Sequence, residues 1–214
     1  MKIAVIAGTP VDTNMGIEFL EEQGHEGMAY PISQTPEEQS LLQVLYADKL
    51  REMVKDRIKD IKAKEIKNIF VYCNSLSAAV DMDSLAKEFN INIITPLQVY
   101  REMGEKFKTI GLLAANNQST YGIEKVIQSS NPNAYIIGVG LLPLVKAIES
   151  KITPKEIMDT YSLDKIIEFM ESFKCEGIIL GCTHFPYVYK ELKEKTSIPI
   201  IDPAMKMLGK LELE

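Results

Sequence analysis

An internal repeat constrains the fold of this 214-residue chain more than any other feature of its sequence. Four short segments recur in the same order, and the spacing agrees, with 70 residues from Ile3 to Cys73 and 72 from Ile110 to Cys182. The matched pairs are Ile3-Ala-Val-Ile-Ala7 with Ile110-Gly-Leu-Leu-Ala114, Gly16-Ile-Glu18 with Gly122-Ile-Glu124, Phe70-Val-Tyr-Cys-Asn-Ser75 with Ile179-Leu-Gly-Cys-Thr-His184, and Ile91-Asn-Ile-Ile-Thr-Pro96 with Ile198-Pro-Ile-Ile-Asp-Pro203. The chain therefore contains two related halves.

Within each half, short β-branched runs alternate with longer segments of helical period. Lys2–Ala7, residues 68–72 and residues 91–95 are typical of buried strands, whereas residues 40–62 carry one apolar stripe opposite a charged face. The predicted stripe consists of Leu41, Leu42, Leu45, Leu50, Met53, Val54, Ile58 and Ile61. This alternation predicts an α/β fold with parallel sheets and helices on both faces.

The repeat also predicts the domain organisation, which is two pseudo-symmetric Rossmann-like α/β domains with an active site in the cleft between them. We expect a first domain of residues 1–97 plus 204–214, which carries Cys73, and a second of residues 98–203, which carries Cys182. Residues 97–107 bridge the halves, and the tail from Ala204 is the helix that follows the second half.

Composition excludes several classes of function. A net charge of -6 without a basic run argues against nucleic acid and anionic membranes as partners. The longest nearly uncharged apolar stretch, residues 134–145, is far shorter than the roughly 18 residues that a transmembrane helix needs. The N-terminal residues are typical of a first strand and not of a signal peptide. Three cysteines, an odd number, predict a reducing, cytoplasmic location without a disulfide framework.

Cys73 and Cys182 each follow a predicted strand, at the edge where open parallel sheets bind ligands. If the halves face each other about a pseudo-twofold axis, the two thiols meet across the cleft. Inversion of a stereocentre next to a carboxylate requires a base on one face and an acid on the other, and two thiols can exchange these roles. A helix N-terminus lowers a cysteine pKa from its usual value of about 8.5, and its N–H groups can hold the substrate carboxylate, assisted by Asn74, Ser75 and Thr183.

Two motifs carry a family resemblance. Tyr72-Cys-Asn-Ser75 and Gly181-Cys-Thr-His-Phe-Pro186 resemble the two cysteine signatures of the aspartate/glutamate racemase superfamily, and the similarity covers essentially the whole chain. The resemblance implies a racemase without cofactor that acts on a small dicarboxylic amino acid, with Cys73 and Cys182 as bases on opposite faces of Cα. It also implies that Asn74, Ser75 and Thr183 bind the carboxylate or amino group. A homodimer is a candidate assembly, because members of the family often pair.

Two turns, each directly after a predicted strand and called corners below, depart from the family pattern. Ala7-Gly-Thr-Pro10 stands where glutamate racemases carry Asp-Ser-Gly, and Asp12 lies five residues past the expected acid, so that role is not transferred to it. The corner at residues 114–118 also differs from the usual Gly-Thr. These corners line the predicted pocket, so the substrate is not determined. A positive group is expected for a distal carboxylate, with Lys49, Arg51 and Lys151 among the candidates.

His184 could be a structural imidazole, a metal ligand or a proton-handling partner of Cys182. Metal is the poorest of these, because the chain lacks Cys-x-x-Cys and His-x-x-x-His spacing, and we expect neither metal nor cofactor. Thr9 and its counterpart Asn116 are expected to contact a small substrate. We interpret Cys175 as a buried core residue.

Two further side chains are expected at the surface. Glu149 follows a Pro-Leu-Val segment similar to that of glutamate racemases, but a surface carboxylate is the favoured interpretation. His25 is expected in a solvated turn.

Two alternatives remain for the function. The same fold resembles maleate isomerases, hydantoin racemases and arylmalonate decarboxylases, of which the decarboxylase uses a single cysteine and accounts less well for two. A non-catalytic acid-binding regulatory protein would explain the altered corners.

Overall fold

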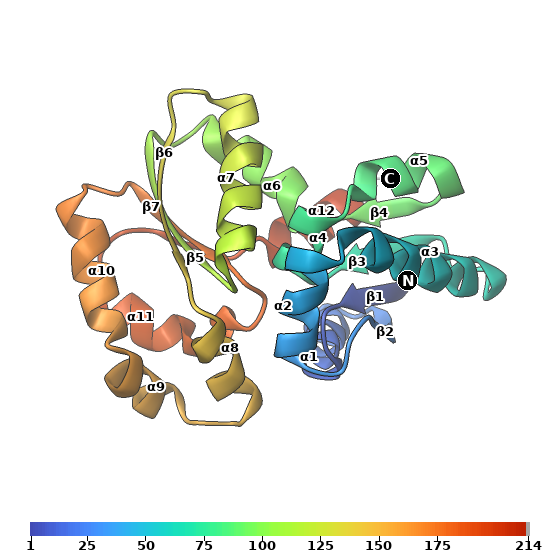
Figure 1. Cartoon of the computed structure of the whole chain (residues 1–214), viewed down its shortest axis with the longest axis horizontal. Coiled ribbons are helices and arrows are strands. Elements are labelled where there is room, and N and C mark those ends of the chain that lie inside the picture. The colour runs from blue at the N-terminus through green and yellow to red at the C-terminus, as the bar shows by residue number, and fades with distance from the viewer. Residues whose placement is uncertain (213–214) are drawn as a thin grey trace. The chain divides into compact units, whose positions relative to one another are not determined.

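Two four-stranded parallel sheets organise the computed structural model, which describes residues 1–212 (Figure 1). The chain divides into two compact units. Unit 1 consists of Met1–Val99 with the segment from Ala204, and unit 2 consists of Tyr100–Pro203. The polypeptide therefore passes from one unit to the other within helix α6 (Pro96–Gly104) and returns at α12 (Ala204–Glu212).

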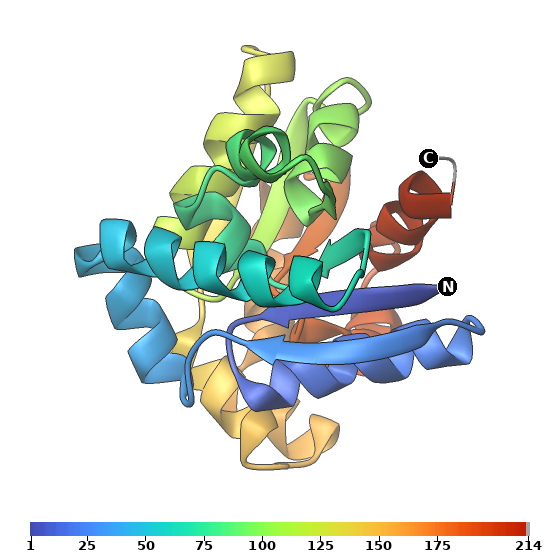
Figure 2. The same ribbon diagram turned by 90° about the vertical axis from the view of Figure 1, so that its right-hand side faces the viewer.

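The sheet of unit 1 has the strand order β2-β1-β3-β4, and all its strands are parallel. Its strands are β1 (Lys2–Ala7), β2 (Glu26–Pro31), β3 (Asn68–Val71) and β4 (Asn92–Ile94). Its helices are α1 (Pro10–Glu22), α2 (Pro36–Leu45), α3 (Ala47–Ala63), α4 (Asn74–Ala79) and α5 (Met82–Phe89), with α12. Figures 1 and 2 show α1 and α3 on opposite faces of this sheet. The central strand β1 is buried on both faces, which is why Ile3–Ala7 are all apolar.

The sheet of unit 2 repeats this arrangement, with the order β6-β5-β7-β8. Its strands are β5 (Thr109–Ala114), β6 (Tyr135–Gly140), β7 (Gly177–Gly181) and β8 (Ile200–Ile201). Its helices are α7 (Asn117–Ser130), α8 (Leu142–Glu149), α9 (Pro154–Tyr161), α10 (Leu163–Ser172), α11 (Tyr189–Lys195) and the 3-10 helix η1 (Phe185–Val188). The core packs Leu113 and Leu180 of the sheet against Ile157, Met170 and Phe185.

The register of the strands repeats as well. Ile6 lies opposite Val71 in unit 1, and the equivalent residues Leu113 and Leu180 lie opposite each other in unit 2. The same order and register confirm the predicted α/β fold built from two related parallel sheets.

The predicted apolar stripe over residues 40–62 is partly wrong. A break at Tyr46, where φ is -132° and ψ is 45°, separates α2 from α3 and changes the phase of the stripe. Leu42, Leu50 and Val54 are buried, whereas Leu41 is 50% and Leu45 is 64% exposed. In α2 the buried residues are Gln39, Leu42 and Gln43.

Helix α12 packs against β3 and β4 in unit 1. The His25 ring, expected in a solvated turn, is instead only 10% exposed and lies between the N-terminal amino group (3.2 Å) and the Glu212 carboxylate of α12 (3.1 Å). The turn is thus tied to the chain terminus and to the last helix of the unit.

No helix among residues 1–212 is long and apolar enough to cross a membrane.

Gly16 tests the packing of α1 on the sheet. A β-carbon at Gly16 would lie 2.8 Å from Tyr72 Cγ and 2.9 Å from Val5 Cγ1. We expect Gly16→Ala to lower the free energy of unfolding by about 1–3 kcal/mol, because overpacking outweighs the gain in helix propensity. Urea unfolding measures this change.

Gly209 of α12 is the matched control, because within residues 1–212 a β-carbon there would meet no atom within 4 Å. Gly209→Ala should raise the free energy of unfolding by up to about 1 kcal/mol. Equal effects of the two substitutions would contradict the packing described for α1.

Candidate active site

Buried polar side chains gather where the strands of unit 1 end. Gly8 and Thr9 follow β1, Ser33 lies beyond β2, Cys73 follows β3 and Thr95 follows β4. All four strands are parallel, so these positions share the edge at which α/β sheets bind ligands. Polar groups buried at such an edge require partners in the protein or in a ligand.

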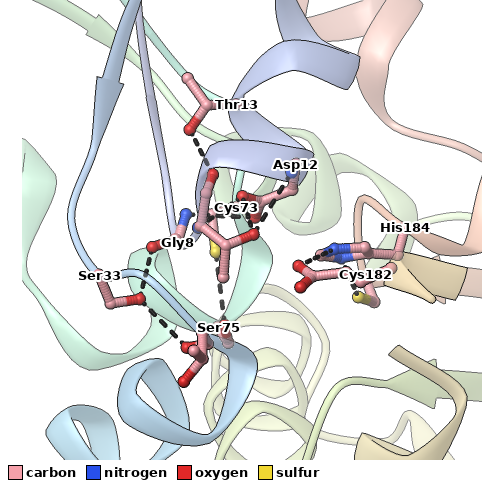
Figure 3. A network of polar contacts seen from close by, with 11 residues as sticks. Gly8, Asp12, Thr13, Ser33, Cys73, Ser75, Cys182 and His184 are labelled. Atoms are coloured by element: carbon pink, nitrogen blue, oxygen red, sulfur yellow. Dashed lines mark hydrogen bonds and ion pairs between the residues drawn. The ribbon is translucent and has the colours of Figure 1, made fainter. Parts of the chain in front are cut away.

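The corner after β1 is closed by Asp12. Its carboxylate accepts hydrogen bonds from the backbone N–H groups of Gly8 (3.1 Å) and Thr9 (2.6 Å) and from the Thr9 hydroxyl (3.1 Å). Thr9 is the N-cap residue of α1, and its hydroxyl in turn accepts the Asp12 N–H at 3.4 Å. This capping box holds the Gly8–Thr9 turn rigidly beside the sheet (Figure 3).

Cys73 is the N-cap residue of α4 and is buried. Its Sγ lies 3.4 Å from Ser75 Oγ (Figure 3). Ser75 Oγ accepts a hydrogen bond of 2.7 Å from Gln43 Nε2 of α2. Since the serine oxygen already accepts from Gln43, its hydroxyl hydrogen is available to the cysteine sulfur. Neutral donors arranged in this way favour a thiolate over a thiol.

The second cysteine has a charged arrangement. Cys182 Sγ lies 3.6 Å from His184 Nδ1, and His184 Nε2 lies 2.9 Å from Glu149 Oε1 (Figure 3). Both partners are largely buried, the His184 side chain being 4% and the Glu149 side chain 13% exposed. The carboxylate can only accept, so it assigns the proton to Nε2 and leaves Nδ1 facing the sulfur. Nδ1 can then take a proton from the thiol or return one to the thiolate.

The interpretation of Glu149 as a surface carboxylate is therefore wrong. Glu149 is the last residue of α8, whose Leu144, Val145 and Ile148 pack into the core of unit 2. Burial of this face carries the terminal carboxylate to His184. The similarity of the Pro-Leu-Val segment was the signal that would have identified it.

The helices that follow the two cysteines are short. The segment after Cys182 is the 3-10 helix η1, with His184 as its N-cap residue, and α4 after Cys73 has six residues. Such short helices align few peptide dipoles.

The remaining predicted binding residues lie at the same edges. Thr9 and Asn116 are equivalent N-cap residues, because Asn116 Oδ1 accepts the N–H of Ser119 at 2.8 Å at the start of α7. Asn74 is buried beside Cys73, and Thr183 is buried beside Cys182. Contact of these four residues with a substrate stays a prediction.

None of the three cation candidates is buried. Arg51 pairs with Glu88 at 3.3 Å, and Lys49 and Lys151 are exposed. Among residues 1–212 no lysine or arginine belongs to the buried set, so the polar interior of each unit is neutral or acidic apart from His184.

Two further buried groups of unit 2 have raised pKa values. Burial, followed by the nearby Asp202 and Cys182, raises the pKa of the Tyr100 hydroxyl well above its usual range. It therefore stays neutral and donates to the Leu180 carbonyl at 3.4 Å, just before Cys182. Burial also raises the pKa of the Cys175 thiol, which lies in the core of unit 2 as expected.

All three cysteines are free. Within the described part of the chain, no group of three or more His, Cys, Asp or Glu side chains is arranged to hold a metal ion.

The two cysteines of unit 2 should differ in reactivity. The thiolate is the nucleophile, and His184 can accept the Cys182 proton whereas burial disfavours the Cys175 thiolate. At pH 8 we expect iodoacetamide to label Cys182 at least about tenfold faster than Cys175. Mass spectrometry of peptides would also show the difference shrinking as the pH rises through the raised Cys175 pKa. Equal rates in the folded protein would contradict this account, and equal rates in urea are the control.

Comparison with known proteins identifies relatives of this chain. The family model for Asp/Glu/hydantoin racemases matches residues 22–206. The glutamate racemase of Limosilactobacillus reuteri is 27% identical over 172 residues, which cover 76% of this chain and 64% of that protein. The glutamate racemase of Buchnera aphidicola is 33% identical over 159 residues, which cover 71% and 61%. The chain thus matches less than two thirds of the length of these two relatives.

Solved structures share the fold. Glutamate racemase from Francisella tularensis, solved in complex with D-glutamate, has a TM-score of 0.79 at 19% identity and covers 99% of this chain and 80% of its own. Aspartate racemase from Picrophilus torridus has a TM-score of 0.73 at 16% identity and covers 99% and 94%. The family match, over residues 22–206, includes parts of both halves of the repeat and both cysteine motifs, and the chain belongs to the Asp/Glu/hydantoin racemase family.

Proposed function

We propose that the protein racemises a small amino acid without a cofactor, and that Cys73 and Cys182 act on opposite faces of the α-carbon. One observation carries the proposal: a buried thiol follows the third strand of both repeated sheets, and each thiol has its own hydrogen-bonding side chain two residues further along the chain. Aspartate and glutamate are the first candidate substrates, because the relatives with the same fold include glutamate and aspartate racemases.

The proposed reaction exchanges one proton at each face. One cysteine, as thiolate, removes the α-hydrogen and becomes a thiol, and the electron pair of the broken C–H bond moves onto the substrate carboxylate. The other cysteine, as thiol, delivers its proton to the opposite face and becomes a thiolate. Protons and charge balance without a metal or pyridoxal phosphate. Asn74 and Thr183 would donate to the carboxylate, and these bonds strengthen as charge develops there, whereas the Ser75 hydroxyl hydrogen points to Cys73.

The side chains that would assist proton transfer differ between the two thiols. His184, held by Glu149, can store the proton of Cys182, whereas Cys73 has a neutral hydrogen bond from Ser75, which itself accepts from Gln43. The proposal therefore makes Glu149 a positioning residue, which acts through His184 and not on the substrate.

Substitution of either cysteine tests the two-base mechanism. In deuterium oxide the native protein should racemise each enantiomer of aspartate or glutamate and place deuterium at Cα. We expect Cys73→Ala and Cys182→Ala each to reduce racemisation by at least about 100-fold, because each removes one acid or base. Polarimetry and proton NMR measure both quantities. Cys175→Ala is the matched control and should keep full activity.

Full activity in either single variant would remove the two-base mechanism. Calorimetric binding of these amino acids without any Cα deuteration would favour a non-catalytic binding protein instead.

Glu149→Gln tests the positioning role. The amide keeps the size of the side chain but loses the charge that supports a protonated His184. We expect kcat to fall about 10- to 100-fold while KM changes little, since general acid–base assistance is weakened. Because two enantiomers are equally stable, kcat/KM must fall by the same factor in both directions. Circular dichroism at fixed substrate concentrations measures both rates.

Glu149→Asp provides a rescue test. A recovery of kcat with the shorter carboxylate would support the charge argument. A purely structural role would instead show itself as a loss of thermal stability with unchanged kcat in Glu149→Gln.

A further inference from the structure

Helix α2 turns two glutamines towards the edge that carries Cys73. Gln39 and Gln43 are one helical turn apart and therefore share a face, and they are only 5% and 3% exposed. Gln43 donates a hydrogen bond to Ser75, as described above. Gln39 differs, because neither its Oε1 nor its Nε2 has a hydrogen-bond partner within residues 1–212, although both atoms are buried.

A buried amide without partners is costly, so a glutamine at this position needs a reason. The side chain lies across the Gly8 turn: a β-carbon built on Gly8 would approach Gln39 Cγ to 3.0 Å and Cδ to 3.2 Å. Any larger residue at position 8 would push the glutamine away from the end of β1. The turn itself is held by Asp12, so Gln39 is placed by rigid neighbours.

The position of Gln39 suggests which part of a ligand it meets. Gln43 reaches Ser75 next to Cys73, where the proposed mechanism places the groups bonded to Cα. Gln39 lies one turn earlier on α2, above the Gly8 corner. A ligand with Cα beside the sulfur would therefore direct its side chain towards Gln39.

The chemistry of the amide determines what this subsite can recognise. A carboxamide offers two N–H donors and one acceptor and carries no charge. Among the described residues no lysine or arginine is buried. The buried carboxylate nearby, Asp12, already accepts from Gly8 and Thr9. A site of this composition distinguishes a hydrogen-bonding group from an apolar one, and it does not require a negative charge.

We propose that Gln39 binds the side-chain end of the substrate, and that this subsite accepts a carboxamide as well as a carboxylate. The inference rests on the proposed racemase function for the identity of the ligand as a small amino acid. It extends the substrate class from aspartate and glutamate to asparagine and glutamine.

Calorimetry with racemic ligands tests this proposal, because turnover does not change the composition of a racemic mixture. We expect DL-aspartate and DL-asparagine to bind the native protein with Kd values within about fivefold of each other, and both at least about tenfold tighter than DL-alanine. Gln39→Leu should weaken both polar ligands at least about tenfold and leave alanine unchanged. The exposed Gln34→Leu is the matched control and should change none of the three.

Gln39→Glu separates charge from hydrogen bonding. A carboxylate at this position can accept the asparagine amide but repels aspartate. The ratio of the aspartate Kd to the asparagine Kd should therefore rise at least about 30-fold.

Gln39→Leu also reports on folding, because it removes buried unpaired polar atoms, and its Tm should be unchanged or higher by about 2–4 °C.

Three outcomes would overturn the proposal: aspartate binding more than about 100-fold tighter than asparagine in the native protein, unchanged affinities in Gln39→Leu, or no binding of any of the three ligands. Deuterium exchange at Cα in the same samples separates this inference from the proposed function. Binding that depends on Gln39 without exchange contradicts the racemase and keeps the subsite. Exchange with binding that does not depend on Gln39 contradicts the subsite alone.

Discussion

Parallel pairing between the first and third strands of each sheet determines where the reactive groups of this protein can lie. Ile6 pairs with Val71, and Leu113 pairs with Leu180, in the same register. That pairing brings the turn after the first strand and the cysteine after the third strand to one edge of the sheet. This arrangement occurs once in each unit. It places the N-cap residue Thr9 and the Cys73 thiol at one edge of the sheet in unit 1, and Asn116 and the Cys182 thiol at the equivalent edge in unit 2.

The two copies have diverged in the groups that serve the thiols. Unit 2 places an imidazole and a carboxylate in series behind Cys182, whereas unit 1 places a hydroxyl and a carboxamide behind Cys73. A charged pair can store a proton, and neutral donors can only stabilise an existing thiolate. The duplication thus preserves positions, and the chemistry depends on the side chains that occupy them. Ser75 and His184 stand at matched positions of the repeat, and Gln43 and Glu149 each come from the first helix after the second strand of their sheet.

The sequence predicted the parts of the structure that depend on local pattern. The parallel α/β fold, the equivalence of the halves and the placement of both cysteines directly after strands follow from periodicity and spacing. The pairing of His184 with Glu149 was missed, because it joins residues 35 positions apart through the packing of α8. The glutamines of α2 were also missed. They lie on the buried face of a separate helix that ends before Tyr46, whereas the apolar spacing of residues 40–62 favoured one continuous stripe.

The separation of the two sulfur atoms in a crystal with a bound substrate analogue tests the central claim most directly. Attack on both faces of one α-carbon requires each sulfur to lie about 3–3.5 Å from it, so the account predicts that Cys73 Sγ and Cys182 Sγ are about 7 Å apart. A separation of more than about 10 Å with the ligand bound, or a ligand in contact with only one of the sulfurs, would contradict two-base catalysis.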